Sequence, residues 1–137
     1  MRVLDDLALL VGRFCAAALF LPAGISKMGK IAGFAGSLAA KGIPFPTLMA
    51  YLTVVVEVGG GLLLILGLFP RITAVVLAGF VVIATATSHV FWILPDPAAQ
   101  AAQQIHFFKN VGIIGGLLFY FASGAGAFAL GRKAAAV

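Results

Sequence analysis

The sequence has few charged residues, and this scarcity limits the classes of protein to which the chain can belong. Only 9% of its 137 residues are charged and 63% are hydrophobic, whereas about a quarter of the residues of a soluble domain are charged. The chain has a single cysteine, Cys15, so it can form neither an internal disulfide nor a CxxC redox pair. A membrane enzyme that relays electrons through its own dithiols is thereby excluded. The net charge of +5 does not indicate nucleic-acid binding, because the nine basic residues are scattered along the chain.

Four long apolar segments are present instead, and each reaches the roughly 20 residues that are needed to cross a bilayer. The sequence LFPR at 68–71 predicts a tight turn between the second and third segments. The prolines of LPDPAAQ at 94–100 separate the third from the fourth, because proline cannot continue a helix. We therefore predict one all-α domain over residues 1–137, an integral membrane four-helix bundle. Its expected spans are about 7–27, 47–69, 72–94 and 105–128.

The connection between the first and second spans is long enough to hold structure of its own. In GKIAGFAGSLAAKGIPFP at 29–46, Ile31, Phe34 and Leu38 share one helical face and the lysines lie on the other. This pattern predicts a short helix in the membrane interface, ending near Gly42. An ordinary loop is the alternative.

The basic residues give a weak indication of orientation. An even number of spans places both termini on the same side, and the excess of Lys and Arg there slightly favours the cytoplasm. The residues on that side are Arg2, Arg71, Arg132 and Lys133, and those on the other side are Lys27, Lys30 and Lys41.

Glu57 is the one carboxylate within the second span. An ionisable group at the bilayer centre costs about 2.5–3.5 kcal/mol on an insertion scale, so Glu57 is expected to face protein. It shares a helical stripe with Thr53, Gly60 and Leu64, which we assign to the bundle interior. Arg13 enters from the opposite end of the first span to a similar depth, and we predict that it pairs with Glu57. A neutral, protonated Glu57 is the alternative.

Further polar residues are expected to gather in the outer half of the membrane. Three spans deliver Lys27, His89 and Lys109 to a similar depth, which predicts a partly cationic pocket with Glu57 and Arg13 at its floor. The candidate catalytic residues are Glu57 and His89, and the candidate substrate-binding residues are Arg13, Lys27, Lys109 and Asn110.

Two further patterns have competing interpretations. His89 and His106 would suit a pair of haem or copper ligands, but isolated histidines more often serve as hydrogen-bonded structural groups, so we predict no metal site and do not expect haem. Gly112 and Gly116 form a GxxxG pair, which predicts close helix packing within a compact bundle.

The ordered set of these motifs resembles the DoxX family of small bacterial membrane proteins. The matching elements are GRFCAAALFLPAGISKM at 12–28, VVEVGGGLLLILGLFPR at 55–71, TSHVF at 87–91, FFKNVGIIGGLL at 107–118 and SGAG at 123–126. Members commonly end in Ser-Leu-Asp after the last helix, whereas this chain continues as GAGAFALGRK, so that acidic group is missing.

The resemblance implies a bacterial inner-membrane location and leaves three functions open. The family takes its name from a membrane component of a thiosulfate:quinone oxidoreductase, which implies a redox subunit that binds a quinone or a small anion. The sequence shows no cofactor motif, so electrons would have to come from a bound molecule or a partner protein. Other relatives act as assembly chaperones or cargo receptors, which implies a non-enzymatic scaffold. A small-molecule transporter is the third function, and it would require a homo-oligomer because four helices make a poor pore.

Overall fold

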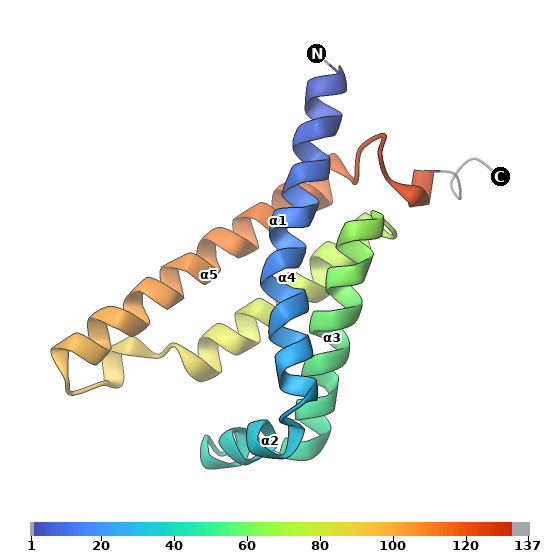
Figure 1. Cartoon of the computed structure of the whole chain (residues 1–137). Helices are drawn as coiled ribbons and strands as arrows, with labels where there is room; N and C mark the ends of the chain where they lie inside the picture. Colours follow the sequence, from blue (N-terminus) through green and yellow to red (C-terminus); the bar gives the residue numbers. More distant parts are fainter. Residues whose placement is uncertain (1, 133–137) are drawn as a thin grey trace.

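Figure 1 shows the computed structural model of the chain, in which residues 2–132 are described. Lys133, which contributed to the predicted orientation, lies outside this range. All regular structure within the range is helical. The elements are α1 (Arg2–Met28), α2 (Ile31–Ala40), α3 (Pro46–Leu66), α4 (Pro70–Ser88), η1 (Phe91–Ile93), α5 (Pro97–Ser123) and η2 (Leu130–Arg132).

The four long helices confirm the predicted membrane spans. α1, α3, α4 with η1, and α5 are each long and apolar enough to cross a bilayer. The short helix predicted in the first connection is also present as α2. Gly42 follows it with a φ of +73°, as expected of a residue that ends a helix in the left-handed conformation.

The last span differs from its predicted bounds at both ends. α5 begins at Pro97 rather than near residue 105, because Asp96 caps it: the carboxylate Oδ2 accepts a hydrogen bond from Ala99 N at 2.8 Å. The first turns are helical although they are not apolar. α5 ends at Ser123 rather than near 128, because Gly124 has a φ of +77°, which a helix cannot continue through.

The long helices form two antiparallel hairpins. α1 packs along α3, α4 packs along α5, and the hairpins meet chiefly through α3 and α4. α4 and α5 diverge from α1 and α3 toward the end of the molecule that carries α2 and η1 (Figure 1). At the opposite end, the N-terminus of α1, the α3–α4 turn and the C-terminal segment, which we define as residues 124–132, lie near one another (Figure 1).

Small residues determine where the helices touch. A methyl group added at Gly24 of α1 would lie 2.7 Å from Val58 Cγ2, and one added at Gly61 of α3 would lie 2.6 Å from Leu21 Cγ. These glycines allow α1 and α3 to approach closely. By contrast, added methyl groups at Gly112 and Gly116 would meet nothing within 4 Å. The GxxxG pair therefore does not mediate packing within the chain, and that part of the prediction is wrong.

Candidate functional site

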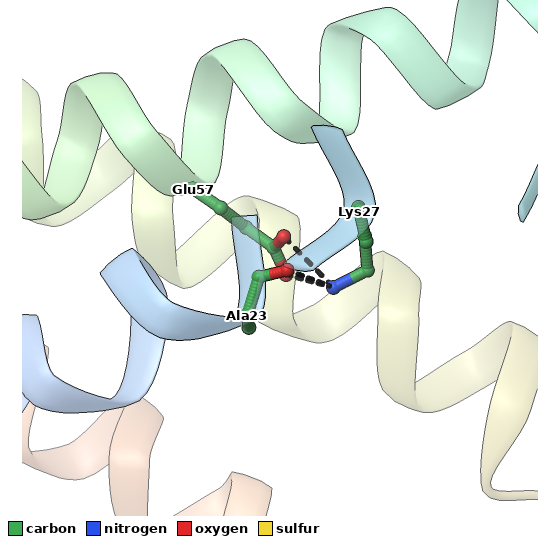
Figure 2. A network of polar contacts seen from close by, with 3 residues as sticks. All are labelled: Ala23, Lys27 and Glu57. Carbon is green, nitrogen blue, oxygen red and sulfur yellow. Dashed lines mark hydrogen bonds and ion pairs between the residues drawn. The ribbon is translucent and has the colours of Figure 1, made fainter. Parts of the chain in front are cut away.

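Glu57 forms an ion pair with Lys27 across the α1–α3 interface (Figure 2). Lys27 Nζ lies 2.9 Å from Oε1 and 2.8 Å from Oε2 of the carboxylate, and 3.4 Å from the carbonyl oxygen of Ala23. The side chains are 25% and 7% exposed, respectively. Pairing the two charges offsets part of the cost of placing them among apolar side chains. Glu57 lies on the buried face of α3 with Gly60 and Leu64, as the predicted stripe requires.

The predicted pair between Arg13 and Glu57 does not form. Arg13 lies beside Gly67, at the C-terminal end of α3, and its Nη2 donates a hydrogen bond to the carbonyl oxygen of Phe128 at 3.0 Å. The ten positions from Glu57 to Gly67 correspond to about 15 Å along a helix. The prediction failed because it aligned α1 and α3 by the middles of their apolar runs. In the structure Gly24, rather than a residue near Arg13, faces Glu57.

A cavity of about 680 Å³ lies between the two hairpins and borders the ion pair. Its walls come from α1, α2, α3 and α4, with Asn110 from α5, and most of them are apolar side chains. This is the region in which the hairpins diverge (Figure 1). The polar side chains that line the cavity are Lys27, Thr53, Glu57, Thr87, Ser88, His89 and Asn110.

Hydrogen bonds between α4 and α5 fix the polar wall opposite the ion pair. Asn110 Nδ2 donates to Thr85 Oγ1 at 2.8 Å, and Thr85 Oγ1 in turn donates to Val81 O at 2.6 Å. Within residues 2–132, this arrangement leaves the Asn110 carbonyl oxygen and its second amide hydrogen without a hydrogen-bond partner.

His89 is oriented in a similar way by α5. His89 Nδ1 lies 2.7 Å from Gln103 Oε1, and the His89 ring stacks on that of His106 at a centroid distance of 5.3 Å. Lys41, just after α2, donates to Ser88 Oγ at 2.8 Å. This last bond connects the end of α2 to the end of α4 beside the cavity.

The structure thus brings together four of the six predicted site residues. Lys27, Glu57, His89 and Asn110 all line the cavity. Lys109 is exposed and is not part of its wall. Arg13 lines a different cavity, between α1 and α5.

Several contacts at this site were absent from the sequence interpretation. The contact of Gln103 with His89 and the hydrogen bond between Lys41 and Ser88 were not predicted. The contact of Phe34 with Lys27, in which the ring centroid lies 5.4 Å from Nζ, was not predicted either. Gln103 precedes His106 by one helical turn, and this spacing is the signal that would place both beside His89. Within residues 2–132, no group of three or more His, Cys, Asp or Glu side chains is placed to hold a metal ion.

The fold and the site define an all-helical membrane protein in which two helical hairpins enclose a cavity with a buried ion pair in its wall. Comparison with known proteins identifies the family. The sequence profile of the DoxX family matches residues 8–90, and the chain belongs to that family.

Two proteins of Escherichia coli (strain K12) are similar over almost their whole length. Inner membrane protein YqjF is 34% identical over 135 residues, covering 96% of this chain and 95% of its own. Inner membrane protein YphA is 33% identical over 125 residues, covering 91% of this chain and 89% of its own. No solved structure matches the chain.

Proposed function

We propose that the protein is the membrane subunit of a redox system and binds a quinone in the cavity between its hairpins. The observation that carries the proposal is the Lys27–Glu57 pair in the wall of a cavity of about 680 Å³, opposite His89 and Asn110. Sites for small molecules typically have volumes of about 300–1,000 Å³, with apolar walls and a few convergent polar groups. The lining of this cavity has that composition.

Charge favours a neutral quinone over the small anion that the sequence also suggested. Lys27 is the only lysine or arginine among the lining residues, and both oxygens of Glu57 already contact its ammonium group. An anion would have to compete with a carboxylate for this cation and would be repelled by Glu57 itself. A neutral head group with carbonyl oxygens needs only hydrogen-bond donors. Asn110 supplies its second amide hydrogen, and Lys27 supplies a donor by giving up its long contact of 3.4 Å with the carbonyl oxygen of Ala23.

The residues also suit the proton chemistry of a quinone. Reduction of a quinone to a quinol consumes two electrons and two protons. In the proposal Lys27 and Asn110 hold the head group by donating hydrogen bonds to its carbonyl oxygens. Glu57, which is a carboxylate in its pair with Lys27, and His89 each take up one proton from water and pass it to one of those oxygens. A partner redox protein supplies the electrons.

Quinone binding is tested by measuring the affinity of the full-length protein, in detergent, for decylubiquinone. Asn110→Leu removes polar donors from the cavity wall, and we expect it to weaken binding at least about tenfold, the loss expected when one good hydrogen bond disappears from a site. Lys109→Gln is the matched control, because Lys109 is adjacent but outside the wall, and it should bind as the unmodified protein does. Equal affinities in the two variants would contradict the proposal.

A specific observation also favours the non-enzymatic scaffold. Gly112 and Gly116 lie on the exposed side of α5 with open space around them, as small residues do where a second helix can approach. The two functions are separated by Gly112→Leu, which would abolish capture of a partner without changing quinone affinity. A folded protein that binds no quinone and loses its partner in this variant would replace the redox proposal with the scaffold.

We further propose that the protein lies in the bacterial inner membrane with both termini in the cytoplasm. The two relatives carry the name inner membrane protein. The α3–α4 turn, which is followed by Arg71 in the first turn of α4, lies at the same end of the molecule as the N-terminus (Figure 1), as the distribution of basic residues requires. A reporter that is active only in the periplasm should be inactive when fused to the C-terminus and active when inserted between Asp96 and Pro97.

A further inference from the structure

A second cavity, of about 410 Å³, lies between α1 and α5. Its α1 wall includes Leu9, Gly12 and Leu19, and its α5 wall includes Ile113, Gly116 and Ser123. Arg13 of α1 and Tyr120 of α5 also line this cavity. Apart from Leu19, which borders both, the residues of this cavity differ from those of the Lys27–Glu57 cavity.

Arg13 and Tyr120 carry polar atoms that the described part of the chain leaves without partners. The two residues are only 2% and 8% exposed. Arg13 Nε and Nη1 and the Tyr120 hydroxyl make no hydrogen bond with residues 2–132, and no carboxylate in that range forms an ion pair with Arg13. A guanidinium with five donors here has one acceptor, the carbonyl oxygen of Phe128. Shielded from water, its charge attracts an anion strongly, because the local dielectric is low.

Polarity changes along the length of this cavity. One end holds Arg13, Tyr120 and Ser123, and the other end holds Leu19 and Ile113. The ten positions from Ile113 to Ser123 correspond to about 15 Å of helix. The polar end lies beside Gly67 in the α3–α4 turn, which is where the chain emerges between two spans. We expect a turn between two spans to lie at the depth of the lipid head groups, with the apolar end of the cavity deeper among the spans.

We propose that the α1–α5 cavity binds an anionic phospholipid, with its phosphate attracted to Arg13 and Tyr120 and one acyl chain lying along the groove toward Leu19 and Ile113. The lipid supplies the negative charge that residues 2–132 do not place beside Arg13. The open space at Gly12 and Gly116, where an added methyl group would meet nothing within 4 Å, leaves room for the chain. The lipid site does not depend on the proposed quinone site.

The test is native mass spectrometry of the full-length protein in neutral detergent, with phosphatidylglycerol and phosphatidylethanolamine of identical acyl chains. We expect phosphatidylglycerol to be retained at least about tenfold more than phosphatidylethanolamine. Both lipids carry a phosphate, but the ammonium group of phosphatidylethanolamine cancels its charge and would be repelled by Arg13. Arg13→Gln should remove this preference. Arg71→Gln, which changes a basic residue at the same end of the molecule but outside this cavity, should preserve it.

A second pair of variants keeps the test valid if Arg13→Gln fails to fold. Gly116→Leu places a bulky side chain in the groove at a position where the added Cβ would meet nothing within 4 Å, and it should abolish lipid retention in a folded protein. Gly115→Leu also adds a side chain in open space but lies outside the cavity wall, and it should retain lipid. Equal behaviour of these two variants, or equal retention of both lipids by the unmodified protein, would overturn the proposal.

Inorganic phosphate separates a lipid from a free anion: it should not displace phosphatidylglycerol, and displacement at millimolar phosphate would overturn the lipid assignment.

Discussion

Arg13 and Lys27 are both basic residues of α1, fourteen positions apart and therefore on nearly the same face of the helix, yet their surroundings are opposite. Lys27 is 25% exposed along its side chain and meets a carboxylate, beside a large cavity. Arg13 is 2% exposed and meets a backbone carbonyl, with no carboxylate of the described chain in ion-pair contact. Lys27 lies at the end where the hairpins diverge, and Arg13 at the end where the C-terminal segment covers them.

This difference follows from what α3 presents to each residue. Near Lys27, α3 presents Glu57, and the two charges neutralise each other. Near Arg13, α3 has ended at Gly67, so the guanidinium meets the backbone of the turn and of the C-terminal segment. The partial negative charge at the C-terminus of a helix favours a cation there, but only by about 0.3–1 kcal/mol. The carboxylate and the ammonium group therefore neutralise each other, whereas Nε and Nη1 of Arg13 have no hydrogen-bond partner within residues 2–132.

The largest effect is expected from breaking the ion pair. Lys27→Met leaves the buried carboxylate of Glu57 without its partner, and we expect a loss of about 3 kcal/mol in the free energy of unfolding, the lower end of the range for buried pairs because Lys27 is partly exposed. The double variant Lys27→Met with Glu57→Leu should recover most of this loss, because an apolar pair often replaces a buried ion pair without cost. Unfolding in mixed micelles measures both. If the double variant were no more stable than Lys27→Met, the two side chains would contribute to stability by more than neutralising each other's charge.

Gly67→Ala is expected to have the next largest effect, and it acts at the Arg13 end. Gly67 has a φ of +67°, a conformation that costs an alanine about 1–2 kcal/mol, and the added methyl group would collide with Arg13 Nη1. We expect a total loss of about 2 kcal/mol. Gly59→Ala, a helical position with open space, is the control and should be neutral or slightly stabilising. Equal effects of the two substitutions would show that Arg13 is not packed against the turn.

The sequence predicted the spans well because membrane insertion depends on length and hydropathy, both of which can be counted along one chain. It also predicted that Glu57 faces protein, since an unpaired carboxylate in lipid is costly. It could not predict which basic residue Glu57 meets. That choice depends on how far α1 slides along α3, which is set by the close contacts of Gly24 and Gly61 rather than by any periodic pattern.

Lys109 and Asn110 illustrate a second limit. They are adjacent in α5, and both were assigned to the pocket, but Asn110 lines the cavity and Lys109 is exposed. In a soluble helix the apolar face identifies the interior. In a membrane helix the exterior is also apolar, so hydrophobic periodicity does not distinguish them. The hydrogen bond from Asn110 to Thr85 shows which face of α5 is inside. Because this bond joins two helices, it could not be predicted from the sequence of α5 alone.

A smaller effect is expected where the C-terminal segment is attached near Arg13. Asp6 Oδ1 accepts a hydrogen bond from Ala127 N at 2.6 Å, and Asp6→Ala removes this acceptor. We expect a loss of about 1.5 kcal/mol, the lower end for a hydrogen bond to a charged group, confined to the C-terminal segment. Hydrogen exchange at the Ala127 amide should accelerate correspondingly, while exchange in α3 stays unchanged. Asp5→Ala changes an exposed neighbour and should leave the exchange rate of the Ala127 amide unaltered. If both substitutions accelerated exchange, loss of the hydrogen bond to Asp6 would not be the cause.

The smallest effect is expected on the far side of the Lys27–Glu57 cavity. Thr85→Val removes the acceptor that Asn110 Nδ2 contacts at 2.8 Å, with little change in shape. Hydrogen bonds between membrane helices contribute about 0.6 kcal/mol on average, so the unfolding free energy should fall by about that amount, and Thr85→Ser should retain it. This loss should be several times smaller than that caused by Lys27→Met, because no charge is left unpaired. If Thr85→Val lost as much unfolding free energy as Lys27→Met, the hydrogen bond between α4 and α5 would stabilise the cavity wall as strongly as the ion pair between α1 and α3. The different surroundings of Lys27 and Arg13 would then not account for the main polar contribution to stability.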